Sequence, residues 1–244
     1  MNIKKVLNKL KKIKTIPNDD FINRLKCSVI GEGMLHEGNI FLINEAIKNM
    51  PSNGYVVEIG TYGGLSTNLI LHLLKKHNKP HTIVGCDAWR YEGYNDKKNV
   101  TNSLYIDGRN DIQRNNYMQY IKKAYIESLK LLSPNRLPHT CHLKSDDFFN
   151  NWNNQNKVTD VFERCLELKG KISFCYIDGD HSYEQTKNDF DNVNKLLLKN
   201  GYVLIDDSAK HMKFGSAKFI NDIKKNNNFK IVDYNPNFLV QKIN

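Results

Sequence analysis

Three aspartates lie at positions where two buried strands of a predicted sheet would end. Asp178 follows the apolar stretch 172–177. Asp206 and Asp207 follow the apolar stretch 202–205. Neighbouring parallel strands end at the same edge of a sheet, so we expect the three carboxylates to converge, where they repel one another unless a cation neutralises them. Oxygen ligands favour a hard divalent ion, magnesium first and manganese next. In the competing interpretation, some of these aspartates cap helices or bind a cofactor directly.

The turn after Asp178 supplies two candidate bases, Asp180 and His181. An aliphatic hydroxyl is a poor nucleophile because it holds its proton tightly. Coordination to a cation lowers the pKa of a bound oxygen, and a neighbouring base then removes the proton. Histidine has the better intrinsic pKa for this step, but a histidine in a turn can also stack or cap, so both residues remain candidates. A nearby His181 or His211 would also make iron(II) an acceptable cation.

A glycine-rich segment, E-I-G-T-Y-G-G-L-S at positions 58–66, separates a strand-like stretch from a helix-like one. Glycines there let the backbone approach a ligand, and the start of a helix supplies free N–H groups. A dinucleotide fingerprint is excluded, because it needs glycine where this chain has Tyr62 and Leu65. The remaining pattern, E-x-G-x-x-G-G, resembles motif I of S-adenosylmethionine-dependent enzymes. That resemblance implies S-adenosylmethionine as cofactor and contacts from Glu58, Gly60, Thr61, Tyr62, Gly63 and Ser66.

Further cofactor contacts are expected at the ends of the next strands. Asp87 ends the stretch 82–86, where an acid can accept hydrogen bonds from both ribose hydroxyls; its alternative is a helix cap or loop turn. Ser145 and Asp146 follow the third predicted strand, where enzymes of this class contact adenine. Asp178 is shared between the predicted cofactor and metal sites.

The stretch I-D-G-D-H-S-Y-E at 177–184, followed by L-L-L-K-N-G-Y and I-D-D, resembles the macrocin-type sugar O-methyltransferases (methyltransferase family 24). The resemblance covers roughly residues 31–243. It implies a metal at Asp178, Asp206 and Asp207 that binds vicinal oxygens of a sugar, with a general base in the D-G-D-H turn. Residues 90–135 depart from the family pattern, which leaves the acceptor open, including a small phenolic or catechol-like molecule.

This insert at 90–135 is rich in tyrosine and arginine. Aromatic faces stack on sugar rings and arginines grip phosphates, so we expect a substrate lid, with Arg90, Tyr91 and the later His211 as substrate contacts. A nucleotide-linked sugar for polysaccharide or glycoconjugate synthesis would satisfy both features. The competing interpretation is a helical cap whose tyrosines, among them Tyr117, Tyr120 and Tyr125, pack inward.

The elements that must position these residues alternate between strand-like and helix-like. Short apolar runs bounded by turns predict a doubly wound, mostly parallel, seven-stranded α/β sheet of Rossmann-like type, as in class I methyltransferases. Two strands at 229–234 and 238–243 are joined by three residues only, which requires an antiparallel hairpin. The expected strands are 55–59, 82–86, 140–144, 172–177, 202–205 and this hairpin, with helices at 40–48, 65–76 and 183–199. We expect Asn39 to cap the first of these helices.

The domain interpretation is an N-terminal helical extension and loop at 1–38 and a catalytic domain at 39–244. Segment 1–14 carries apolar residues at helical spacing between lysines, which predicts an amphipathic helix packed on its own domain rather than on a membrane. The net charge of +10 comes from lysines spread along the chain, so we expect an anionic, phosphate-bearing small molecule and no nucleic-acid partner.

No apolar run in the sequence is long enough to span a bilayer, and the N-terminus lacks a secretory signal core. The five cysteines form no C-x-x-C pair and argue against disulfides or structural zinc. We therefore expect a cytoplasmic enzyme, and whether it forms a homodimer stays open. Rival functions are a nucleic-acid methyltransferase, disfavoured by I-D-G-D-H in place of an N/D-P-P-Y motif, and a hydroxylase-like or non-catalytic relative with the same fold.

Overall fold

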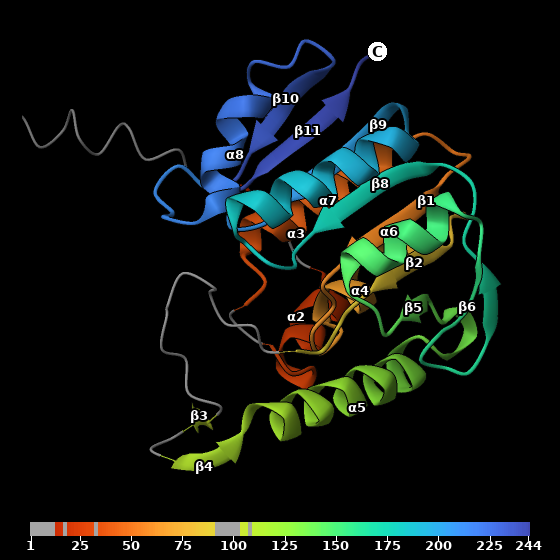
Figure 1. Cartoon of the computed structure of the whole chain (residues 1–244), viewed down its shortest axis with the longest axis vertical. Coiled ribbons are helices and arrows are strands. Elements are labelled where there is room, and N and C mark those ends of the chain that lie inside the picture. The colour runs from red at the N-terminus through yellow and green to blue at the C-terminus, as the bar shows by residue number, and fades with distance from the viewer. Residues whose placement is uncertain (1–12, 17–18, 32–33, 91–102, 107–108) are drawn as a thin grey trace, which may run out of the picture.

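A seven-stranded sheet forms the centre of the computed structural model, which describes residues 13–16, 19–31, 34–90, 103–106 and 109–244 (Figure 1). The strands follow the order β10-β11-β9-β8-β1-β2-β5. Their bounds are β1 Tyr55–Ile59, β2 Ile83–Cys86, β5 His139–Cys141, β8 Ile172–Ile177, β9 Leu197–Ile205, β10 Phe229–Tyr234 and β11 Phe238–Lys242. All neighbours pair in parallel except β11, which runs antiparallel to both β9 and β10. The predicted fold class is therefore confirmed.

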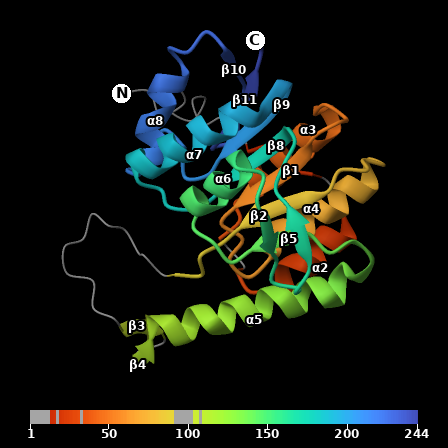
Figure 2. The same ribbon diagram turned by 45° about the vertical axis from the view of Figure 1, so that its right-hand side comes forward.

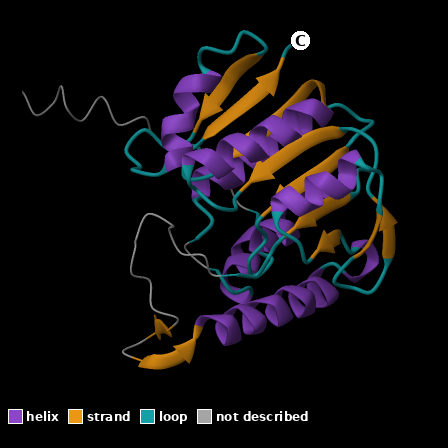
Figure 3. Ribbon diagram, viewed as in Figure 1, coloured by secondary structure: helices purple, strands orange, loops and turns teal. Residues whose placement is uncertain are grey.

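Helices cover both faces of this sheet (Figures 1 and 3). One hydrophobic cluster packs one face of the sheet under the helices α2 Asp20–Ser28, α3 Glu37–Asn49, α4 Leu65–Lys76 and α5 Arg114–Leu132. A second cluster packs the other face under α6 Ser145–Asn153, α7 Tyr183–Leu196 and α8 Gly215–Ile223. Alternate residues of the parallel strands enter the two clusters because successive side chains of a strand point to opposite faces. The three predicted helices are thus found, and α2, α5, α6 and α8 are additions.

The boundary between α7 and β9 differs from its expected position. The sequence pattern extends the helix to Lys199 and places Asn200 and Gly201 at its end, whereas α7 ends at Leu196. β9 begins at Leu197 and contains both residues in an irregular part of its pairing with β8. Asn200 has φ +64°, which lets the strand bulge there. Apolar runs such as Leu196-Leu197-Leu198 suit a buried helix and a buried strand equally well, so pairing with β8 decides the outcome.

The insert at 90–135 contains a short hairpin and a long helix. β3 Ser103–Ile106 pairs with β4 Arg109–Gln113, and α5 follows directly. Figures 1 and 2 both show α5 running past α4 and β5, along one edge of the molecule. Tyr125 of α5 is fully buried and its hydroxyl hydrogen-bonds that of Thr140 in β5 at 2.5 Å. The competing interpretation is therefore confirmed for Tyr125, which packs inward, and is wrong for Tyr120, which is 57% exposed.

The remaining elements are peripheral. A small hairpin, β6 Lys157–Thr159 with β7 Cys165–Glu167, and the 3-10 turn η1 Pro134–Arg136 lie outside the main sheet. The predicted N-terminal helix at 1–14 falls almost wholly outside the described residues. Within the described ranges, each helix is too short or too polar to cross a bilayer. Three of the five cysteines are buried and, as expected, all five are unpaired.

Asp19 fastens α2 to α4. Its carboxylate accepts a hydrogen bond from the Ile22 amide at 3.2 Å and so caps α2. Its other oxygen lies 2.7 Å from Lys76 Nζ and 3.0 Å from His72 Nε2, both on α4. Burial alone would raise the pKa of Asp19, but the hydrogen bonds from Lys76 and His72 outweigh it and hold the pKa below its usual range. The folded state therefore favours ionised Asp19.

Substitutions of Asp19 separate the contribution of the helix cap from that of the ion pairs with Lys76 and His72. We expect Asp19→Ala, which loses cap and ion pairs, to lower the free energy of unfolding by about 1–3 kcal/mol. Asp19→Asn keeps the capping oxygen and should lose about half of that. Because the pKa of Asp19 is lower in the folded than in the unfolded protein, its contribution is present above about pH 4 and is lost on further acidification. Urea unfolding between pH 3 and 7 checks this, and equal losses for both variants at all pH values would contradict it.

Candidate active site

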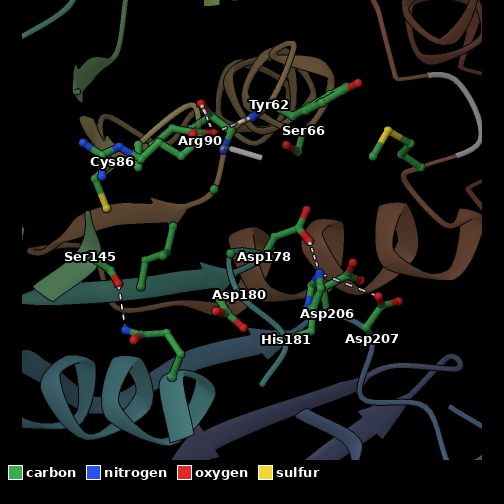
Figure 4. A pocket seen from close by; sticks show the side chains of 18 of the residues that line it. Tyr62, Ser66, Cys86, Arg90, Ser145, Asp178, Asp180, His181, Asp206 and Asp207 are labelled. Atoms are coloured by element: carbon green, nitrogen blue, oxygen red, sulfur yellow. Dashed lines mark hydrogen bonds and ion pairs between the residues drawn. The ribbon is translucent and has the colours of Figure 1, made fainter. Parts of the chain in front are cut away.

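A cavity of about 570 Å³ opens at the carboxyl ends of the central strands (Figure 4). Its walls come from the segments that follow β1, β2, β5, β8 and β9, with additions from the loop before α3, from α5 and from the start of α8. Open parallel sheets bind ligands at this edge. Most of the site residues predicted from sequence line the cavity: Gly60, Thr61, Tyr62, Gly63, Ser66, Asp87, Arg90, Ser145, Asp146, Asp178, Asp180, His181, Asp206 and Asp207.

The glycine-rich loop after β1 is closely packed against other parts of the protein. Gly60 has φ +80°, and a Cβ there would lie 2.1 Å from the carbonyl oxygen of Asp178. Gly64 has φ +91°, and a Cβ there would lie 2.9 Å from the Ser128 hydroxyl of α5. Both positions need glycine for protein packing as well as for backbone conformation. The loop can therefore present its backbone to the cavity while its other side rests on the β8 loop and on α5.

Asp87 holds this loop in place from the end of β2. Its Oδ2 accepts hydrogen bonds from the amides of Thr61 at 2.8 Å and Tyr62 at 2.9 Å, and its Oδ1 accepts one from the Trp89 amide at 2.6 Å. Burial raises the pKa of Asp87 although these three donors stabilise its charge. A carboxylate has about four acceptor positions, so a ribose contact through a remaining lone pair stays a prediction.

Glu58 is the one predicted cofactor contact that does not line the cavity. Its side chain is fully buried beneath the glycine-rich loop. Oε2 accepts a hydrogen bond from the Thr67 hydroxyl at 2.6 Å, and Oε1 has no hydrogen-bond partner among the described residues. Burial raises the pKa of Glu58 to about 7, against the hydrogen bonds from Ser66 and Thr67. The geometry therefore points to support of the loop rather than contact with a ligand in the cavity.

The sequence did not predict which residues contact Tyr62. Trp89 Nε1 donates to the Tyr62 carbonyl at 3.0 Å, and the Tyr117 hydroxyl of α5 lies 2.5 Å from the Tyr62 hydroxyl. Met118, next to Tyr117, lines the cavity. The tyrosine richness of the insert was the available signal, but the partner of each tyrosine depends on how α5 packs.

Ser145 and Asp146 begin α6 and share one partner across the cavity wall. Gln185 Nε2 of α7 lies 3.0 Å from Ser145 Oγ and 3.1 Å from Asp146 Oδ1. The same amide lies 3.0 Å from Asp189 Oδ1, a buried carboxyl whose pKa burial raises to about 7. Gln185 lines the cavity and is thus a site residue that the sequence alone did not reveal.

The acidic cluster lies at the ends of β8 and β9. One donor atom from each of Asp178, His181 and Asp206 falls within 4.8 Å of the others. His181 Nε2 lies 3.9 Å from Asp178 Oδ1 and 3.6 Å from Asp207 Oδ2, and Figure 4 shows it between these two carboxylates. Convergence was expected for three carboxylates, but the tight group contains only two of them, Asp178 and Asp206, with His181 instead of Asp207 as its third member. Asp207 lies on the side of the His181 ring opposite Asp178 (Figure 4).

The electrostatics of this cluster fit a divalent cation. Burial and the neighbouring charge of Asp206 raise the pKa of Asp178 well above its usual value. Burial also raises the pKa of Asp207, partly offset by His181 and reinforced by Asp206. Crowded carboxylates of this kind suit a hard cation, and an imidazole beside them is compatible with manganese or iron(II) as well as magnesium. The donor set therefore fits the predicted metal.

The asparagine predicted to cap the helix at 40–48 has a different role. His36 is the cap of α3, and its ring Nδ1 accepts from the Gly38 amide at 2.9 Å. Asn39 lies inside the first turn, is fully buried, and its amide donates to Asp206 Oδ1. The prediction was wrong because a short polar residue before an apolar stretch marks a helix start only to within a turn.

The three predicted substrate contacts differ in their position relative to the cavity. Arg90 is exposed and lines the cavity. Tyr91 lies outside the described residues. His211 is exposed and is not among the cavity-lining residues, so the structure gives it no place in the site. His211 is also absent from the tight donor group found among the described residues.

Comparisons with known proteins agree with this geometry. The family model described as a methyltransferase domain (methyltransferase family 24) matches residues 57–208, more than half of the chain. Nothing among curated protein sequences matches significantly.

Solved structures of low sequence identity share the fold. A putative caffeoyl-CoA O-methyltransferase from Staphylococcus aureus aligns with a TM-score of 0.58 at 13% identity, over 93% of both chains. The S-adenosylhomocysteine (SAH)-bound methyltransferase PaMTH1 from Podospora anserina gives 0.57 at 11% identity, over 100% of this chain and 98% of that one. The SAH complex of an O-methyltransferase from Bacillus cereus gives 0.54 at 15% identity, over 99% and 96%. The sheet order is that of the class I methyltransferase fold.

Glu58 offers a test of the buried charge beneath the glycine-rich loop. Its pKa is about 7 in the folded protein and 4.5 in its unperturbed state, so the folded state holds the proton longer and stability falls as pH rises from about 4.5 to 7. Glu58→Gln removes this penalty. We expect the variant to gain stability relative to wild type over that range, by about 3 kcal/mol at pH 8.

Urea unfolding at pH 5 and pH 8 measures the difference, with Glu127→Gln on exposed α5 surface as the control. Parallel stability curves for wild type and Glu58→Gln would contradict the buried-charge interpretation. Loss of cofactor affinity in Glu58→Gln with unchanged stability would instead restore the direct contact predicted from sequence.

Proposed function

The chain belongs to this methyltransferase family, and from that premise we propose that it transfers the methyl group of S-adenosylmethionine to a hydroxyl of a sugar with the help of a divalent cation. One observation carries the proposal. The same cavity is lined by the glycine-rich loop after β1 and by the acidic cluster after β8 and β9. A methyl donor on the first and a hydroxyl on the second would meet within one enclosed space.

The cofactor's amino-acid part is assigned to the glycine-rich loop, its ribose to Asp87 and its adenine to the Ser145–Asp146 side with Gln185. S-adenosylmethionine, when bound, supplies an electrophilic methyl group that needs a nucleophile in line with its leaving sulfur. The amides of Gly60, Thr61, Tyr62 and Gly64 already donate within the protein, so the cofactor's carboxylate is assigned to the N-terminus of α4, whose first turn includes Ser66. The close approach of Gly60 to the Asp178 carbonyl fixes the position of the loop relative to the end of β8.

The cation is assigned to Asp178, Asp206 and Asp207, with magnesium first and manganese or iron(II) as alternatives. An ion held by these residues would supply Lewis-acid stabilisation for the acceptor hydroxyl as it loses its proton. The chain's own contribution is to hold donor atoms of Asp178, His181 and Asp206 within 4.8 Å of one another, with Asp207 3.6 Å from His181. His181 lies within the same group of donors, so it can serve beside the ion or as a ligand.

His181 is the better candidate for the general base. Asp180 accepts a hydrogen bond from the Ser182 amide at 2.7 Å, which stabilises the turn that begins α7. His181 Nε2 faces the carboxylates of Asp178 and Asp207 at 3.9 and 3.6 Å, and its ring lines the cavity, where it can reach the proton of a bound hydroxyl. We therefore assign proton removal to His181 and positioning of the turn to Asp180.

A nucleotide-linked sugar is the acceptor we favour. Arg90 and Lys144 line the cavity and can meet a phosphate, and the chain carries a net charge of +10. Apolar groups favour a second candidate, a phenolic or catechol-like acceptor, because Met34, Leu35 and Phe214 also line the cavity. One neighbour in fold is described as a putative caffeoyl-CoA O-methyltransferase. Both candidates offer adjacent oxygens to a cation.

For the chain as a whole, we propose a catalytic domain at 39–244 preceded by an extension at 1–38. We retain a lid role only for the part of the insert that faces the cavity. Met118 lines the cavity, whereas Tyr125 is committed to the core. In this arrangement α5 supports the glycine-rich loop, and the first turns of α5, around Met118, belong to the part of the insert with the lid role.

Calorimetric titration with S-adenosylmethionine tests the two halves of the proposal. We expect chelator-treated wild type to bind the cofactor and to bind Mg²⁺ or Mn²⁺. Asp206→Ala should keep cofactor binding and lose at least tenfold in metal affinity, because it removes a ligand. Cofactor binding with equal metal affinity in wild type and Asp206→Ala would eliminate the carboxylate site. Absence of cofactor binding would eliminate the methyltransferase reaction.

Methyl transfer to a panel of nucleotide sugars and catechols then decides the acceptor. Turnover of catechols alone would reject the sugar assignment, and turnover of nucleotide sugars alone would reject the phenolic one.

Substitution at the D-G-D-H turn separates the base from the positioning residue. We expect His181→Asn to lower kcat by about 10²–10⁴-fold, the usual contribution of a general base. Asp180→Asn retains an oxygen acceptor for the Ser182 amide and should lower kcat by less than about tenfold. Metal affinity measured in parallel shows whether His181 also serves as a ligand. The reverse order of the two losses in kcat would assign the base to Asp180.

A further inference from the structure

Asp206 is held by a buried network that reaches it from two distant parts of the chain. Its Oδ1 accepts hydrogen bonds from the side-chain amides of Asn39 in α3 and Asn237 in the β10–β11 turn, the latter at 2.6 Å. Both asparagines are almost entirely buried, at 0% and 3% exposure. Two amides therefore donate to one carboxylate oxygen and fill its two acceptor positions, and neither of them donates to Oδ2.

The orientation of both amides is fixed by the backbone. Asn237 Oδ1 accepts from the amides of Ser208 and Ala209, each at 3.0 Å, so this atom must be the oxygen. Its Nδ2 then donates to Asp206 and, at 3.0 Å, to Asn39 Oδ1. The amide nitrogen of Asn39 must in turn face Asp206 and the Tyr176 hydroxyl at 3.2 Å. Neither asparagine can flip without leaving buried donors facing each other.

The two ends of the network are also fastened to each other. Asn235, two residues before Asn237, donates to the Gly38 carbonyl at 3.4 Å. A Cβ on Gly38 would lie 1.4 Å from the Asn235 carbonyl oxygen, so the start of α3 and the hairpin turn touch at their backbones. Asn235 also pairs with the backbone of Lys14 through both of its amide atoms, at 2.9 and 2.8 Å. The positions of Asn39 and Asn237 are thereby determined independently of Asp206.

We propose that Asn39 and Asn237 are positioning residues that occupy Oδ1 of Asp206 and so leave this carboxylate one oxygen, Oδ2, to offer a divalent cation. The inference rests on the metal site of the proposed function. A carboxylate limited to one oxygen suits small cations such as Mg²⁺ and Mn²⁺, which prefer six single-oxygen ligands. Ca²⁺ is larger and readily takes both oxygens of one carboxylate. The asparagine pair would therefore set metal preference as well as affinity.

A purely structural role is the competing interpretation, in which the network only joins the hairpin to α3. The two readings differ in what an asparagine variant changes. Loss of a structural joint lowers stability, whereas loss of a positioning group changes the properties of the bound ion. Asn39 is the better residue to substitute, because Asn237 also caps the backbone of Ser208 and Ala209.

The experiment measures Mn²⁺ binding by electron paramagnetic resonance, with Mg²⁺ and Ca²⁺ as competitors. The proteins are wild type, Asn39→Leu, which keeps the side-chain volume, Asn39→Ala, which removes it, and Asp206→Ala. Asn44→Leu is the matched control, because Asn44 lies on the same helix and loses its 2.8 Å hydrogen bond to His77 without touching Asp206. S-adenosylmethionine affinity reports whether the cavity is intact.

We expect both Asn39 variants to bind Mn²⁺ about 10–100-fold more weakly than wild type and to lose part of the preference for Mg²⁺ over Ca²⁺. Asn44→Leu should bind the ions as wild type does. Asn39 variants that melt earlier yet keep wild-type Mn²⁺ affinity and ion preference would overturn the inference and leave the metal site standing. If wild type binds Mn²⁺ no better than Asp206→Ala, the metal site itself fails and the inference fails with it.

Discussion

Repulsion between carboxylates at the ends of β8 and β9 is the constraint around which the rest of the site is organised. Adjacent parallel strands must deliver Asp178 and Asp206 to the same place. Burial raises the pKa of Asp178, and the neighbouring negative charge of Asp206 raises it further. The fold tolerates this cost through amide donors from Asn39 and Asn237, which stabilise the charge of Asp206. In the proposed function, a divalent cation at this point would neutralise the crowded carboxylates, and relief of their repulsion would contribute to its binding.

The loops at the carboxyl edge support one another. Gly60 packs against the carbonyl of Asp178, so the position of the glycine-rich loop and the position of the acidic cluster depend on the same contact. Asp87 binds two amides of that loop from β2. A methyl donor and a hydroxyl acceptor need alignment to within a fraction of an ångström, and three mutually packed loops provide it better than independent ones.

The helix α5 extends this support to the edge of the sheet. The Ser128 side chain packs against Gly64. The hydroxyl of Tyr125 hydrogen-bonds that of Thr140, and the hydroxyl of Tyr117 hydrogen-bonds that of Tyr62. The helix of the insert therefore bears directly on the glycine-rich loop. Its tyrosines face different surroundings according to helical position: Tyr125 is in the core, Tyr117 contacts Tyr62, and Tyr120 is exposed.

The sequence by itself determined the class of fold, most strands of the sheet and fourteen of the thirty residues that line the cavity. Glycine, aspartate and histidine at strand ends can be recognised as site residues from the local sequence, because parallel topology brings strand ends to a common edge. Tertiary structure alone decided the partners of these residues. Glu58 lies beneath the cavity rather than in it, Asn39 reaches Asp206 instead of capping its helix, and Asn237 and Gln185 enter the site from distant segments. No pattern in the chain encodes such contacts, because they depend on how separate helices and turns pack over the finished sheet.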